Sequence, residues 1–161
     1  MLRQLPALCA GVMMLAACTG GNTNTGSPPE TTTGQLWVDS FPDDFGPDYF
    51  RTKLSNVHFD TDGYALSAEA QNTLQHQAAW LQHYPQYALT IDGHADERGT
   101  REYNLALGER RADAVMAYLI ALGVDPKRLK TISYGKERPT CTEANETCWS
   151  QNRRSVSTLD Q

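Results

Sequence analysis

The pattern of apolar and polar residues after residue 50 predicts strands and helices in alternation. Four short segments have the period-two pattern or the length of β-strands, and they lie at 57–59, 89–91, 129–134 and 155–159. Between them, longer segments place apolar residues three or four positions apart, which is the spacing of one face of an α-helix.

Two of the predicted helices have clear ends. Ser67 is placed to cap a helix whose apolar positions continue to Leu81, and Pro85 ends it. The second helix has Gly123 at its C-terminal end. Its expected core-facing positions are Leu105, Gly108, Ala112, Val115, Leu119 and Leu122. With a short helix expected around 143–152, the order βαβαβ(α)β predicts an α/β domain of the α+β sandwich type, in which helices pack on a mixed sheet.

Residues 1–17 have the features of a targeting segment. Arg3 precedes an apolar run that is too short to span a bilayer, for which about 20 apolar residues are needed. The run ends in Leu15-Ala16-Ala17-Cys18, which resembles the lipobox of bacterial lipoproteins. This resemblance implies that cleavage leaves Cys18 at the N-terminus with covalently attached lipid, and Thr19 after it favours the outer membrane. An ordinary signal peptide with an incidental cysteine is the alternative.

Residues 18–50 are predicted to be a flexible tether. From Thr19 to Gly34 no large apolar side chain occurs, so this stretch cannot bury enough surface to offset the entropy lost on ordering. Four aromatic residues then recur at every fourth position, but the prolines and glycine among them oppose a continuous helix. These aromatics are Trp37, Phe41, Phe45 and Tyr49. We expect them to dock against the following domain, and a strip that binds a partner is the alternative.

The net charge of −5 comes mostly from the tether. Residues 19–50 carry five acidic residues and no Lys or Arg, whereas the predicted globular domain, residues 51–161, carries thirteen basic and fourteen acidic residues. A domain with this balance has no basic stripe for a phosphate backbone, so nucleic acid is not an expected partner.

The four cysteines fall into different classes. Cys9 lies in the targeting segment and Cys18 in the lipobox, which leaves Cys141 and Cys148 as an even pair in a compartment that permits disulfides. We therefore predict a Cys141–Cys148 disulfide. Zinc binding is the rival interpretation, and the lack of a second cysteine pair nearby argues against it.

The densest charges lie in the stretch GHADERGTREYNLALGERRADAV, residues 93–115. Asp96 falls in the loop after the second predicted strand, Asp62 in the matching loop after the first, and Arg111 on the following helix. An Asp accepts hydrogen bonds from an ammonium group, and an Arg grips a carboxylate with two parallel hydrogen bonds. These three residues are thus complementary to a free amino-acid group.

Four motifs resemble the OmpA-like peptidoglycan-binding domain and, among its members, the peptidoglycan-associated lipoproteins. They are VHFDTDGY, GHADERGTREYNLALGERRADAV, SYGKERP and NRRSV, and they cover nearly all of residues 55–159 in order. The resemblance implies a protein anchored by lipid on the periplasmic side of the outer membrane, where it binds peptidoglycan non-covalently. It also implies a Tol–Pal system that supports envelope integrity and cell division, with TolB and other Tol proteins as partners.

In this family the ligand is meso-diaminopimelate of the peptide stem, whose side chain ends in a free amino-acid group. The resemblance implies that Asp96 binds the ammonium, that Arg111 binds the carboxylate, and that Asp62 frames the pocket. Thr61, Asn104 and Leu107 are the supporting positions. The family often has an aromatic residue in place of Thr61, so one wall of the pocket is expected to differ in this chain.

The same charges have other interpretations. Asp96 and Arg111 would, without the family resemblance, be read as a surface ion pair. We assign the remaining charges mainly to a solvated face, helix ends and loop bracing. They are Glu97, Arg98, Arg101, Glu102, Glu109 and Arg110. Arg153 and Arg154 are expected to brace the end of the sheet or to face solvent.

An enzyme is a rival class, because several side chains at two strand ends resemble metal ligands or acid–base groups. They are His58, Asp60, Asp62, His94 and Asp96. Their spacing matches no calcium loop, and the sequence has neither H-E-x-x-H nor G-x-S-x-G. We therefore expect no catalytic residues, no metal and no cofactor apart from the lipid on Cys18. A wall-binding or adaptor lipoprotein outside the Tol system is the further alternative.

Overall fold

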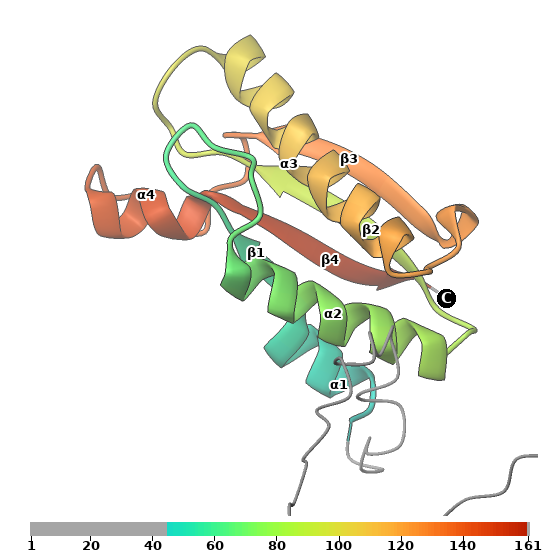
Figure 1. Ribbon diagram of the computed structural model, residues 1–161. Helices are drawn as coiled ribbons and strands as arrows, with labels where there is room; N and C mark the ends of the chain where they lie inside the picture. The colour runs from blue at the N-terminus through green and yellow to red at the C-terminus, as the bar shows by residue number, and fades with distance from the viewer. Residues whose placement is uncertain (1–44, 161) are drawn as a thin grey trace, which may run out of the picture. The chain divides into compact units, whose positions relative to one another are not determined.

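The computed structural model describes residues 45–160 and has a mixed sheet of four strands in the order β1-β4-β2-β3 (Figure 1). The strands are β1 (Asn56–His58), β2 (Ala88–His94), β3 (Leu129–Gly135) and β4 (Arg154–Asp160). β2 and β3 run parallel, whereas β4 pairs antiparallel with both β1 and β2. The predicted order of elements and the mixed sheet are confirmed.

Two long helices, α2 (Ala68–His83) and α3 (Arg101–Ala121), lie side by side over one face of this sheet (Figure 1). The shorter helical segments are α1 (Pro47–Tyr49), the π-helical η2 (Phe50–Leu54), the 3-10 turn η3 (Pro126–Arg128) and α4 (Glu146–Asn152). No helix among residues 45–160 is long and apolar enough to cross a membrane.

The ends of the long helices follow the local signals in the sequence. The Ser67 side chain accepts a hydrogen bond from Ala70 N at the start of α2, as predicted, and Thr100 accepts one from Tyr103 N at the start of α3. α2 ends just before Pro85, as expected. Gly123 follows α3 with a φ of 92°, a left-handed conformation that glycine adopts without strain.

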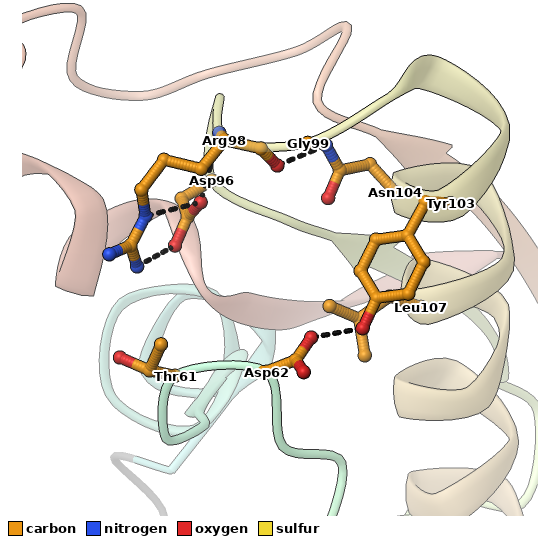
Figure 2. A pocket seen from close by; sticks show the side chains of 8 residues that line it. All are labelled: Thr61, Asp62, Asp96, Arg98, Gly99, Tyr103, Asn104 and Leu107. Carbon is orange, nitrogen blue, oxygen red and sulfur yellow. Dashed lines mark hydrogen bonds and ion pairs between the residues drawn. The ribbon is translucent and has the colours of Figure 1, made fainter.

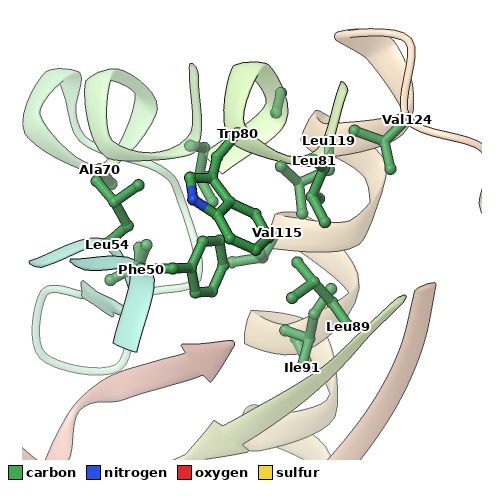
Figure 3. Packing of buried hydrophobic residues seen from close by; sticks show 14 of the residues in the cluster. Phe50, Leu54, Ala70, Trp80, Leu81, Leu89, Ile91, Val115, Leu119 and Val124 are labelled. Atoms are coloured by element: carbon green, nitrogen blue, oxygen red, sulfur yellow. The ribbon is translucent and has the colours of Figure 1, made fainter. Parts of the chain in front are cut away.

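The apolar core lies between the sheet and the two long helices (Figure 3). Trp80 of α2 is fully buried and packs on Phe50, with the ring centroids 4.8 Å apart. Leu89 and Ile91 of β2 meet Val115 of α3 in the same cluster. Because alternate residues of a strand point to opposite faces, the apolar residues of β2 cover the helix side, while Thr90, Asp92 and His94 point to the other.

One predicted core position is wrong, because Leu105 is 48% exposed. The buried stripe of α3 begins instead at Asn104 and Leu107. A Cβ on Gly108 of α3 would lie 2.8 Å from Gly93 O of β2, so backbone meets backbone at this point. The helix therefore approaches the sheet through glycine rather than through an intervening leucine.

The segment before β1 is packed against the domain. Trp80 Nε1 donates to Phe45 O at 2.7 Å, and the rings of Phe45 and Tyr49 lie 4.0 Å apart. The predicted docking is thus confirmed for Tyr49, which packs against the core cluster, while Phe45 is joined to the domain through its backbone carbonyl. Phe50, which we placed at the end of the tether, is fully buried, so the packed core starts before residue 51.

Several predictions concern residues outside the described part of the chain. They are the targeting segment 1–17, the lipid on Cys18, the tether as far as residue 44, and the docking of Trp37 and Phe41. They remain predictions.

The predicted Cys141–Cys148 disulfide is present, with the two Cα atoms 5.1 Å apart. It joins the loop after β3 to the first turn of α4. Asn145 caps this helix by accepting a hydrogen bond from Cys148 N at 2.9 Å.

Candidate functional site

A pocket of about 380 Å³ lies where the loops after β1 and β2 meet the first turns of α3 (Figure 2). Its lining residues are Thr61, Asp62, Asp96, Arg98, Gly99, Tyr103, Asn104 and Leu107. Five of these were predicted as site residues, so the structure brings together groups that lie up to 46 positions apart in the sequence.

Asp62 is presented by a tight turn after β1. Gly63 N donates to Asp60 O at 3.1 Å across this turn, and Asp62 has a φ of 58°, which Asp tolerates better than most residues. Its carboxylate accepts a hydrogen bond from the Tyr103 hydroxyl across the pocket (Figure 2). That hydrogen bond raises the pKa of Tyr103.

Asp96 lies on the opposite side of the pocket and is 8% exposed. Arg98 reaches back to it, with Nε 3.1 Å from Oδ1 and Nη2 2.6 Å from Oδ2 (Figure 2). Burial by itself would raise the pKa of Asp96, but the hydrogen bonds from Arg98 and Arg153 outweigh burial and lower it. Asp96 is therefore held ionised, as an ammonium-binding group must be.

Arg111 is 1% exposed and does not line the pocket. Its guanidinium donates to three carbonyl oxygens: Gly63 O at 2.8 Å, His94 O at 2.8 Å and Asp60 O at 3.1 Å. Burial lowers its pKa to about 10, so it stays charged at neutral pH. Arg111 thus ties the turn that carries Asp62 to the end of β2, just before Asp96.

The supporting positions are placed as the helical spacing predicts. Asn104 and Leu107 both line the pocket and are buried. The Asn104 side-chain amide donates to Arg98 O at 2.7 Å, so it holds the loop that leads into α3. Gly99 in that loop has a φ of 88°, which favours glycine.

Three lining residues were missed from the sequence: Arg98, Gly99 and Tyr103. Among the roles expected for Arg98, a solvated face, a helix end or loop bracing, the structure shows the last, because Arg98 hydrogen-bonds to Asp96 in the same loop. Tyr103 had a usable signal, since it lies four residues before Leu107 on the same stripe of α3. Its ring stands beside the pocket (Figure 2), so an aromatic wall is present opposite Thr61 rather than at that position.

Two of the five side chains considered from the sequence as metal ligands or acid–base groups, Asp62 and Asp96, line the pocket. Among residues 45–160, no three His, Cys, Asp or Glu side chains are grouped to hold a metal ion. His94 is 4% exposed and stacks on Tyr134, with the ring centroids 5.6 Å apart. Burial first, and then Arg154 and Arg138, lower its pKa to about 4, so it is neutral.

The comparisons with known proteins agree with this geometry. A family model described as the OmpA family matches residues 58–153. The chain is 59% identical over 103 residues to a peptidoglycan-associated lipoprotein of Agrobacterium fabrum. The aligned residues are 64% of this chain and 58% of that relative.

Two further matches extend the likeness. A peptidoglycan-associated lipoprotein of Haemophilus influenzae is 39% identical over 151 residues, which is 92% of this chain and 93% of the relative. The crystal structure of the peptidoglycan-associated lipoprotein from Burkholderia pseudomallei superposes with a TM-score of 0.64 at 42% identity, and covers 66% of this chain and 90% of that one.

Proposed function

The chain belongs to the OmpA family and, within it, to the peptidoglycan-associated lipoproteins, and from this premise we propose that it attaches the outer membrane to peptidoglycan without catalysing a reaction. Lipid on Cys18 anchors the protein in the periplasmic leaflet of the outer membrane. The tether lets the domain extend to the peptidoglycan, and the pocket binds the peptide stem non-covalently. The bound group is the free amino-acid end of a meso-diaminopimelate that has not been crosslinked.

The observation that carries this proposal is the pair of carboxylates, Asp62 and Asp96, on two sides of one pocket. Two carboxylates suit a ligand ammonium, and Asp96 is held ionised by the hydrogen bonds that it accepts from Arg98 and Arg153. Leu107 offers an apolar surface to the methylene chain that separates the two amino-acid ends of diaminopimelate.

Arg111 supports the other half of the zwitterion. An arginine has five N–H donors, and the three carbonyls that Arg111 contacts use three of them. The remaining donors belong to a buried, charged guanidinium that interacts with both pocket carboxylates. In this proposal the positive charge of this guanidinium, beside the pocket, stabilises the ligand carboxylate, which a lysine-containing stem does not carry at that position.

The test is titration calorimetry of the full chain in detergent with a soluble muropeptide whose stem ends in meso-diaminopimelate. We expect Asp96→Asn to weaken binding about tenfold or more, because a hydrogen bond to a charged group is worth about 1.5–3 kcal/mol. Asp113→Asn, an exposed position on α3, is the matched control and should bind like the wild type. A folded wild type that binds the lysine stem equally well would refute the zwitterion pocket.

A place in the Tol–Pal system is the finer part of the proposal. It is supported by membership of the peptidoglycan-associated lipoproteins, and it makes TolB the expected protein partner. Crosslinking of the tagged lipoprotein in cells, followed by identification of the captured proteins, tests it. Recovery of peptidoglycan without any Tol protein would favour the alternative, a wall-binding lipoprotein outside that system.

A further inference from the structure

The short helix α4 contacts the pocket from outside through Trp149. The Arg98 guanidinium lies over the Trp149 ring, with its central carbon 4.3 Å from the ring centroid. Trp149 Nε1 donates to Glu97 Oε1 at 2.9 Å, which fixes the plane of the indole. The N–H edge of the same guanidinium makes two hydrogen bonds to Asp96, so one arginine joins α4 to the pocket carboxylate.

Glu146 makes a second connection between α4 and the pocket. Its carboxylate accepts from Arg153 Nη2 at 2.6 Å and lies 4.0 Å from Arg98 Nη1. Arg153 is buried, donates to Phe59 O at 3.2 Å, and approaches Asp96 Oδ2 at 3.5 Å. Asp96 therefore sits between two arginines that are both oriented by Glu146.

The loop that carries these residues is held rigidly. The disulfide closes it between Cys141 and Cys148, the residue directly before Trp149. Asn152 at the end of α4 accepts from Thr140 N at 2.8 Å and donates to Cys141 O at 2.7 Å. Neither Trp149 nor Glu146 lines the pocket, so any effect they have on a ligand passes through Arg98 and Arg153.

We propose that Trp149 and Glu146 are positioning residues for ligand binding, which hold Arg98 and Arg153 so that Asp96 is preorganised to receive the ligand ammonium. This inference rests on the proposed function. Arg98 is a long side chain that is partly exposed, and without its stacking partner it has many accessible conformations. Binding would then have to order it, and ordering one such side chain costs affinity.

The test uses the full chain in detergent and the soluble meso-diaminopimelate muropeptide. We expect Trp149→Ala to weaken binding about threefold to tenfold, the range of a lost cation–π contact with the ordering of one side chain. Trp149→Phe keeps an aromatic face under Arg98 and should restore most of the affinity. Glu146→Gln should also weaken binding. Glu143→Gln, the same change within the same disulfide-closed loop, should not, because the hydrogen bond that the Glu143 carboxylate accepts comes from Asn145 and not from an arginine beside Asp96.

A pH profile separates positioning from a general loss of structure. The charged groups around Asp96 are Arg98, Arg153, Arg111 and, through them, Glu146 and Asp62. Because hydrogen bonds from Arg98 lower the pKa of Asp96, a loosened Arg98 lets that pKa rise. The acidic limb of muropeptide binding by Trp149→Ala should therefore move to higher pH than in the wild type.

The outcomes are distinct. If Trp149→Ala is folded and binds as tightly as the wild type with the same acidic limb, the positioning role is refuted while the proposed function stands. If the folded wild type does not bind the muropeptide, the proposed function fails and the inference fails with it. If Trp149→Phe is as weak as Trp149→Ala, stacking on Arg98 is not the cause and the inference is also refuted.

Discussion

At the scale of single residues, Arg111 decides the geometry of the pocket. A buried guanidinium is costly unless its donors are satisfied, and the carbonyls of Asp60, Gly63 and His94 satisfy three of them. This requirement places the turn of Asp62 against the end of β2. Arg111, whose charge suits a ligand carboxylate, thus also holds together the two loops that form the site.

Tyr103→Phe tests the role of the Tyr103 hydroxyl in the pocket. The hydroxyl donates to Asp62, so its removal frees that carboxylate to rotate, and we expect muropeptide affinity to fall about threefold to tenfold, the range of one hydrogen bond. Calorimetry measures the change, with Tyr118→Phe on the same helix as the control. Absorbance titration offers a second measurement, since Asp62→Asn removes the negative charge beside the hydroxyl and should reduce the rise in the pKa of Tyr103. Unchanged affinity in Tyr103→Phe would contradict this role.

At the scale of elements, the site depends on how closely α3 approaches the sheet. A Cβ on Gly93 would lie 1.9 Å from Gly108 O, and one on Gly135 would lie 2.9 Å from Leu105 N. These contacts are to backbone atoms, which cannot rotate away. Gly93, Gly108 and Gly135 therefore let the first half of α3 lie against β2 and β3. In that position Asn104 and Leu107 of α3 reach the pocket.

Gly93→Ala should separate α3 from β2. We expect the free energy of unfolding to fall by about 3 kcal/mol, the upper part of the usual range for an overpacked core, and binding to weaken as Leu107 moves. Urea denaturation followed by circular dichroism measures the change. Gly46→Ala, where a Cβ would meet nothing within 4 Å, is the control and should stay within about 0.5 kcal/mol of the wild type. Equal stability of the two variants would contradict the close packing.

At the scale of the whole molecule, the two faces of the sheet differ in chemistry. The helix side is apolar, whereas the other side carries the buried imidazole of His94 near Asp92, Arg138 and Arg154. The pKa of His94 falls to about 4 because burial and two arginines disfavour its charged form. In the folded protein this imidazole therefore stays neutral over a range of pH in which it is protonated in the unfolded chain.

This difference makes stability depend on pH. Above the ordinary histidine pKa of 6.5 both states are neutral, so His94 has no effect; between 6.5 and about 4 the unfolded state binds the extra proton, and stability falls as pH falls. We expect His94 to account for about 1–3 kcal/mol of the loss between pH 7 and pH 4, after allowance for solvent screening. Urea denaturation at a series of pH values measures it. His94→Gln should lose less stability over this interval, and an equal slope in both proteins would contradict the assignment.

The order of the strands and the long helices, the Ser67 cap and the Gly123 helix end could be predicted from the sequence alone, because these features depend on local signals. The disulfide could be predicted because Cys141 and Cys148 are the even pair left for a compartment that permits disulfides. The period of apolar residues, Ser67 before α2 and Gly123 after α3 act within a few residues of where they stand. Asp62, Asp96 and the helical stripe of Asn104 and Leu107 were also found, with help from the family motifs.

The remaining features required the tertiary structure, because they depend on contacts between distant segments. Leu105 has the spacing of a core residue, yet it is exposed, and α3 meets the sheet at Gly108, where an added Cβ would lie 2.8 Å from Gly93 O. The pairing of Arg98 with Asp96, and its support by Trp149 some fifty residues later, follow only when α4 folds back beside the β2 loop. Periodicity reports which face of an element is buried, but not which side chain of another element it meets.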